Sequence, residues 1–132
     1  MYIECDFAYD LSKDQGRVGD TFMEQIEPLA ATLPYMTCNG NHENYYNFSN
    51  YKARFNMPND NKKMYYSFNV GPIHFVSMST EFMYFPNYGF QQIFDHYEFV
   101  KNDLIVSELV RGGTRSRSRL TRILIFFCNR KN

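Results

Sequence analysis

An amphipathic segment between two short apolar runs is the feature that most constrains this 132-residue chain. Between residues 16 and 33, apolar side chains recur at steps of three and four residues, as is typical of a helix with one buried face. The recurring side chains are Val18, Phe22, Ile26, Leu29 and Leu33. Because apolar runs at residues 2–3 and 33–38 flank this segment, we expect a strand on each side. Strand, helix and strand in this order form a parallel crossover, which brings the ends of both strands to one edge of a sheet.

A polar loop follows each of these two strands. The first is Asp6-Phe7-Ala8-Tyr9-Asp10, and the second is Asn39-Gly40-Asn41-His42-Glu43, in which Asn-Gly marks a sharp turn. Open α/β sheets bind their ligands in loops of this kind, beyond the carboxyl ends of the strands. An Asp carboxylate and a Tyr phenolate suit a hard ion such as Fe(III), and Asn and His can also bind metals. The second loop alone is equally compatible with a polar turn whose His42 is merely solvated.

Charge separates the chain into two parts. The 14 acidic residues all lie in residues 1–108, together with 7 basic ones, whereas residues 109–132 contain 7 basic residues and no acidic one. This asymmetry indicates a basic tail or a segment foreign to the rest of the chain. Taken alone, the Arg-rich residues 111–119 could bind nucleic acid phosphates, and residues 120–128 would form a strand or a sticky tail.

Several other patterns narrow the class of protein. No run of 18 apolar residues is present, so we expect no membrane span, and the N-terminus shows no signal pattern. The three cysteines lack the spacing of a metal site. Cys5 and Cys38 are interpreted as small buried residues, and a disulfide between them is possible but cannot be deduced from the sequence. The odd number of cysteines does not define a disulfide framework.

The rest of the chain up to Leu109 predicts mixed structure. We expect a short helix at residues 50–55, a hairpin formed by residues 64–70 and 73–80, and a helix at residues 90–109. Inward-facing residues of that last helix should be Phe94, Tyr97, Val100, Leu104 and Ile105. His74 alternates within a strand and is interpreted as a structural residue, and His96 as a surface or half-buried one. The aromatic residues 81–86 could form a pocket wall.

The residues also resemble a known family. Asp6-x-x-Tyr9 followed by Gly40-Asn41-His42-Glu43 resembles two of the five metal motifs of the purple acid phosphatases, which are calcineurin-like metallophosphoesterases. The resemblance continues through residues 65–71, 74–81 and 91–104, so we place it at residues 1–109. The motifs Gly-Asp-x-Gly, Val-x-x-His and Gly-His-x-His do not occur here, and Cys5 replaces a usual Gly.

This resemblance implies a fold of class α/β and a division of the chain. Residues 1–109 would be a partial catalytic domain, incomplete at both ends, with a mixed β-sheet and flanking helices. They would make up about half of the αββα sandwich, with an apolar sheet face exposed. Residues 110–132 are expected to be a non-family tail, aberrant or disordered, from a frameshift, an intron or an alternative exon.

The family also implies a reaction, namely the hydrolysis of phosphate monoesters by a dinuclear centre of Fe(III) and a divalent ion (Fe, Zn or Mn). Asp6 would bridge the two ions, Tyr9 would bind Fe(III), and Asn41 the divalent ion. His42 would hold or protonate the substrate, and Glu43 would orient the loop without taking part in the chemistry. A secreted or lysosomal location is implied too, with Asn47 as a glycosylation site. We expect no nucleic acid partner, and the oligomeric state stays open.

The missing metal ligands leave two other functions as alternatives, a binding protein without activity and a different metallophosphoesterase. Only three of the seven side chains that the family uses as metal ligands are present, so we expect the isolated chain to bind iron poorly and to have little phosphatase activity. The alternative is a catalytically inactive truncated or splice product that acts only by binding partners. A third reading is a metallophosphoesterase for nucleotides or phosphoproteins, against which Tyr9 argues.

Overall fold

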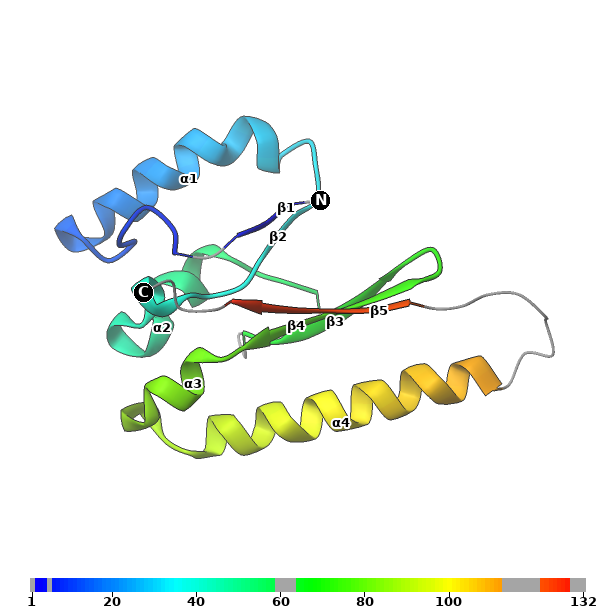
Figure 1. Ribbon diagram of the computed structural model, residues 1–132. Coiled ribbons are helices and arrows are strands. Elements are labelled where there is room, and N and C mark those ends of the chain that lie inside the picture. The colour runs from blue at the N-terminus through cyan, green and yellow to red at the C-terminus, as the bar shows by residue number, and fades with distance from the viewer. Residues whose placement is uncertain (1, 5, 59–63, 113–121, 129–132) are drawn as a thin grey trace.

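The structure, a computed structural model, describes residues 2–4, 6–58, 64–112 and 122–128. Two β-sheets and several helices make up these residues (Figure 1). The strands are β1 (Tyr2–Glu4), β2 (Tyr35–Thr37), β3 (Tyr66–Val70), β4 (Ile73–Ser79) and β5 (Arg122–Cys128). The helices are α1 (Arg17–Ala30), α2 (Tyr45–Arg54), α3 (Glu81–Tyr84) and α4 (Gln91–Gly112), with short 3-10 turns η1 (Asp14–Gly16), η2 (Asn41–Glu43) and η3 (Pro86–Tyr88). The architecture is of class α/β, which confirms the class that the sequence predicted.

The first crossover consists of β1, α1 and β2. The two strands are parallel, with Tyr2 opposite Tyr35 and Glu4 opposite Thr37, which confirms the predicted order and direction. The predicted helix is also confirmed, although it ends at Ala30. Phe22, Met23 and Ile26 pack against the hydrophobic core, while the charged side chains of α1 are exposed.

Helix α2 begins earlier than the sequence indicates. It covers Tyr45–Arg54, whereas we expected residues 50–55. Its first turn is irregular because Tyr46, Asn47 and Phe48 all have a positive φ, which helical patterns do not reveal. Phe48 and Tyr51 are completely buried in the core, and their burial compensates for this local strain.

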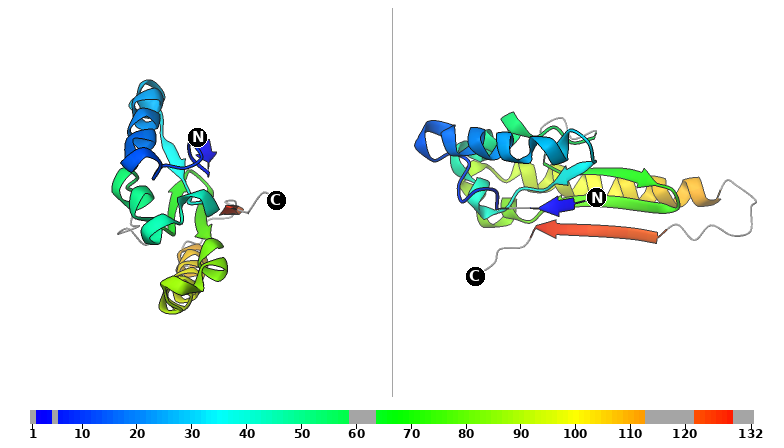
Figure 2. Two further views of the ribbon diagram at one scale, coloured as in Figure 1. Left: turned by 90° about the vertical axis from the view of Figure 1, so that its left-hand side faces the viewer. Right: turned by 90° about the horizontal axis from the view of Figure 1, so that it is seen from above.

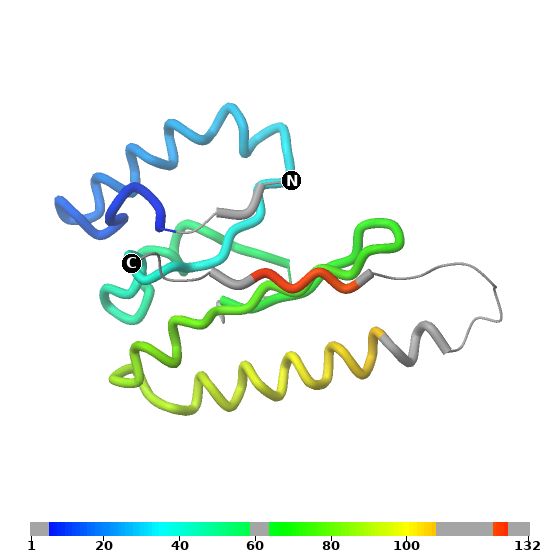
Figure 3. The backbone as a smooth tube through the Cα atoms, in the orientation of Figure 1, coloured from blue at the N-terminus to red at the C-terminus, as the bar shows by residue number. Residues whose placement is uncertain are grey.

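The second crossover consists of β4, α4 and β5. Strands β3 and β4 are antiparallel, with Tyr66 opposite Ser77, and this confirms the predicted hairpin. Strand β5 lies parallel to β4, with Ile73 opposite Arg122, so β3, β4 and β5 form a mixed sheet with α4 beside it (Figure 2). Part of the segment expected to be a foreign tail is therefore a strand, and residues 113–121 and 129–132 lie outside the described residues. Figure 3 shows the same arrangement of strands and helices as a tube through the Cα atoms.

The predicted inward face of α4 is wrong in part. Phe94 and Tyr97 are 63% and 64% exposed, and Ile105 is also exposed, whereas Val100 and Leu104 are half-buried. His96 is buried, contrary to our expectation, because its ring stacks on Tyr65 with centroids 4.9 Å apart. Apolar residues surround this helix on every side, so their periodicity does not select one face.

A buried polar network orients α4 instead. His74 on β4 is hydrogen-bonded through Nδ1 to Asn69 Oδ1 and through Nε2 to Asp103 Oδ2, both at 2.7 Å. The Ser67 hydroxyl donates to the other oxygen of Asp103 at 2.5 Å. Because buried polar groups need partners, this network fixes the side of α4 that faces the hairpin. In the described part of the chain, no helix combines the length and the apolar composition that crossing a bilayer requires.

Candidate metal centre

Glu43 joins the two polar loops. Its carboxylate accepts hydrogen bonds from the backbone N–H groups of Asp6 (3.1 Å), Phe7 (2.8 Å) and Gly40 (2.8 Å). The side chain is only 2% exposed, and this burial raises the pKa of Glu43 to about 7, although the three N–H groups act in the opposite direction. One carboxylate therefore fixes the loop after β1 against the loop after β2.

Gly40 allows the two loops to approach closely. A Cβ atom placed on Gly40 would lie 2.1 Å from Asp6 Oδ1, so no side chain fits there. The His42 N–H donates to the same oxygen at 3.3 Å. Next to this contact, burial raises the pKa of the Cys38 thiol to about 12, with smaller contributions from the carboxylates of Glu43 and Asp6.

His42 contacts two residues of the first loop. Its ring centroid lies 4.3 Å from that of Tyr9, which is 57% exposed, and its Nδ1 is hydrogen-bonded to Asp10 Oδ1. Asp10 is buried, and Lys13 Nζ lies 3.5 Å from its other oxygen. Asp10 was absent from our sequence-based set of site residues. In the sequence, only its position beside Tyr9 could have indicated a role for Asp10, because its partner His42 is 32 residues away.

The structure thus brings most of the predicted site residues together. Asp6, Tyr9, His42 and Glu43 form one set of contacts, and half-buried Asn41 lies in the same turn, η2, as His42. Asn47 lies apart on α2, where its Oδ1 accepts a hydrogen bond from Lys52 Nζ at 3.4 Å. A further bond, from Asn39 Nδ2 to Ser79 Oγ at 3.0 Å, connects the ends of β2 and β4.

The chemistry of the donors fits hard metal ions. The carboxylate of Asp6, the phenol of Tyr9 and the amide of Asn41 are oxygen ligands, which suit Fe(III) and hard divalent ions. Among the residues that the structure describes, however, no group of three or more His, Cys, Asp or Glu side chains could hold a metal ion. The predicted ligand set differs from such a group, because it combines Asp6 with the oxygen donors of Tyr9 and Asn41.

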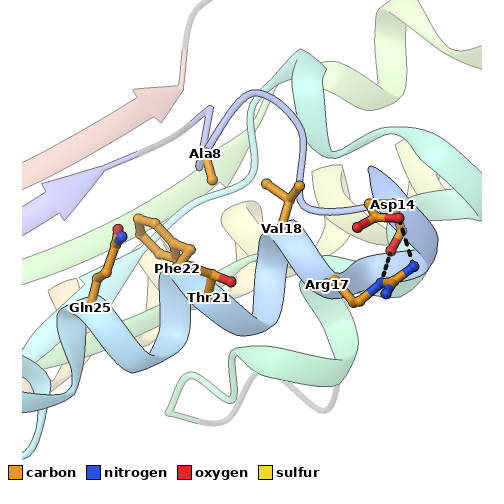
Figure 4. Close-up of a pocket in the computed structure, with 7 residues that line it drawn as sticks. All are labelled: Ala8, Asp14, Arg17, Val18, Thr21, Phe22 and Gln25. Atoms are coloured by element: carbon orange, nitrogen blue, oxygen red, sulfur yellow. Dashed lines mark hydrogen bonds and ion pairs between the residues drawn. The ribbon is translucent and has the colours of Figure 1, made fainter.

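A cavity of about 480 Å³ lies between the first loop and α1 (Figure 4). Ala8, Val18 and Phe22 supply its apolar lining, and Arg17 and Asp14 lie at one end. Arg17 and Asp14 form an ion pair of 2.9 Å, so each neutralises the charge of the other. The cavity shares Ala8 with the loop that carries Tyr9.

Comparison with known proteins identifies relatives for most of the chain. It is 57% identical over 99 residues to acid phosphatase type 7 of Mus musculus and 56% identical to that of Homo sapiens; each match covers 75% of this chain and 23% of the relative. It is also 31% identical over 122 residues to a protein of Arabidopsis thaliana named "Probable inactive purple acid phosphatase 9", covering 66% of this chain and 18% of that protein. The chain thus spans about a quarter of the length of the first of these relatives. No family model and no solved structure matches.

Proposed function

This chain belongs to the purple acid phosphatase family, and on that premise we propose that it supplies part of the catalytic centre of a phosphate monoester hydrolase. The observation that carries the proposal is the junction at Glu43, whose three backbone hydrogen bonds join the loop of Asp6 and Tyr9 to the loop of Asn41 and His42. Phosphate ester hydrolysis needs such convergence, because one site must hold the phosphate and the attacking water together.

Each loop residue has a distinct proposed role. Asp6 and Tyr9 would hold Fe(III), and Asp6 and Asn41 a divalent Fe, Zn or Mn ion. Bound metals of this kind neutralise phosphate oxygens and lower the pKa of a bound water. With its Nδ1 bonded to Asp10, His42 has Nε2 to hold a phosphate oxygen or to give a proton to the leaving oxygen. Tyr9 packs against the His42 ring and limits its rotation.

The proposal also covers the substrate, the location and the glycosylation of the protein. The substrates would be phosphate monoesters hydrolysed at acidic pH, and the location would be secreted or lysosomal. Asn47, in the sequon Asn47-Phe48-Ser49, would carry a glycan. Its side chain is half-buried, so attachment of the glycan would displace the contact with Lys52.

One observation favours a second candidate, a catalytically inactive product that binds partners. No group of three His, Cys, Asp or Glu side chains with metal-binding geometry exists in the described ranges. The polar loops would then serve only to shape a surface.

A chimera tests the proposal. The homologous 99-residue segment of the mouse relative would be replaced by that of this chain, and the hydrolysis of p-nitrophenyl phosphate and the iron content would be measured. We expect His42→Ala to lower kcat by about 100-fold or more while iron is retained, as for loss of a proton donor. Tyr9→Phe should lower both activity and iron content.

Tyr46→Phe is the matched control, because it also removes one tyrosine hydroxyl and Tyr46 is 77% exposed on α2. It should leave activity and iron content unchanged. A chimera whose His42→Ala and Tyr9→Phe variants keep full activity would contradict the proposal. An inactive chimera without iron would favour the binding-protein candidate.

A further inference from the structure

The residues from Glu81 to Phe90, which we call the aromatic segment, begin with two buried side chains and then present exposed apolar ones. Met83, Tyr84 and Phe90 are 64%, 55% and 65% exposed. The segment follows β4 directly and contains α3 and η3. No charged residue occurs between Phe82 and Phe94, a stretch of 13 residues. Exposed apolar patches of this kind commonly bind a ligand or a partner.

The aromatic segment is held against α2 and against Asn44, the residue after the second polar loop. The Tyr88 hydroxyl donates to the backbone oxygen of Asn44 at 2.9 Å, and Asn44 follows Glu43 in the chain. Phe48 of α2 makes edge contacts with the rings of Phe82 and Tyr88, at centroid distances of 6.0 and 6.2 Å. The Asn39–Ser79 bond joins the strand ends from which the two segments depart. The aromatic segment therefore lies next to α2 and to Asn44, the residue that follows the turn η2 with Asn41 and His42.

We propose that the aromatic segment binds the leaving group of the phosphate monoester and selects esters whose leaving group is an aromatic ring. The inference rests on the proposed function of the loops. In the reaction, the oxygen of water joins phosphorus, the ester P–O bond breaks, and the departing phenolate oxygen takes a proton to become a phenol. With the phosphate at the metal loops, the ring lies on Met83 and Tyr84, where thioether and aromatic contacts are favourable. A charged leaving group has no ionic partner on this stretch.

Two measurements test this inference separately. In the chimera, the ratio of kcat/KM for 1-naphthyl phosphate to that for glycerol 2-phosphate should fall about tenfold in the double variant Met83→Ala/Tyr84→Ala, because the naphthyl ring loses the apolar surface that it would cover on binding. In the chain alone, saturation-transfer NMR should show contact between the protein and the naphthyl protons. This contact should be lost in the same double variant.

Phe94→Ala and Tyr97→Ala are matched controls, since both side chains are about as exposed on α4 but lie beyond the aromatic segment. They should change neither the ratio nor the NMR signal. An unchanged ratio in an active chimera, or equal naphthyl contact in the double variant, overturns the inference. If the chimera hydrolyses no ester while the Tyr84-dependent NMR contact persists, the hydrolase proposal fails and binding of the aromatic ring stands.

Discussion

The two crossovers of this molecule bury their polar groups in different places. In β1–α1–β2 the buried carboxylate of Glu43 lies beyond the strand ends and bonds backbone amides of two loops. In β4–α4–β5 the buried pair of His74 and Asp103 lies between the helix and the sheet. The first arrangement fixes loops that carry the predicted site residues, whereas the second fixes a helix whose exposed side mixes aromatic and charged residues. The buried polar residues thus fix the two polar loops in the first crossover and the position of α4 in the second.

The largest effect should come from breaking the junction between the loops. Glu43→Ala leaves three backbone N–H groups without their acceptor, so we expect a loss of about 3–5 kcal/mol in the free energy of unfolding. Urea denaturation measures it. Glu43→Gln keeps one oxygen and should lose roughly half as much. Glu24→Ala, at an exposed position of α1, should change stability by less than about 0.5 kcal/mol. A loss below about 1 kcal/mol for Glu43→Ala would show that the junction does not hold the loops.

A smaller loss should follow disruption of the second crossover. Asp103→Ala removes the partners of His74 Nε2 and of the Ser67 hydroxyl, with an expected cost of about 2–3 kcal/mol. Hydrogen exchange should accelerate in α4 and the hairpin and stay unchanged in α1. Asp95→Ala is the control, because Asp95 is exposed on the same helix and bonds only to Gln91 among the contacts observed. Equal acceleration in β1–α1–β2 would mean that the two crossovers are not independent.

The smallest effect concerns pH. Burial lowers the pKa of His96 to about 4 from its ordinary value of 6.5. Between these values the unfolded chain binds a proton that the folded chain excludes, so stability falls as the pH falls. We expect a loss of about 1 kcal/mol between pH 6.5 and 5.5. His96→Phe keeps a ring against Tyr65 and should remove this slope in urea titrations.

The pH dependence of stability that Glu43 causes is opposite in sign to that of His96, so it distinguishes the two crossovers further. Its pKa is raised to about 7, so its contribution is complete below its ordinary value of 4.5 and is lost as the pH rises through 7. Glu43→Gln should flatten the alkaline side of the same curve and leave the acidic side unchanged. A wild-type curve without either slope would contradict both assignments.

The sequence predicted those parts that depend on local patterns. The parallel crossover follows from the amphipathic pattern of α1, and the hairpin from alternation around Gly71 and Pro72. The orientation of α4 was not predictable, because its apolar residues face all directions and two distant partners, Tyr65 and His74, select the buried side. The meeting of the two polar loops at one edge was also predicted, from the order of strand, helix and strand. Asp10 was missed because only its contact with His42 distinguishes it from an ordinary loop residue.

The contact between Gly40 and Asp6 restricts how this unit can be redesigned. Since even one methyl group on Gly40 would overlap the Asp6 carboxylate, neither loop can be exchanged for a homologous sequence without regard to the other. An engineer who transplants this centre into another scaffold must therefore move both loops, with their spacing, as a single cassette. Recombination breakpoints inside residues 6–43 would be disfavoured for the same reason, and breakpoints beyond the second loop would be tolerated more readily.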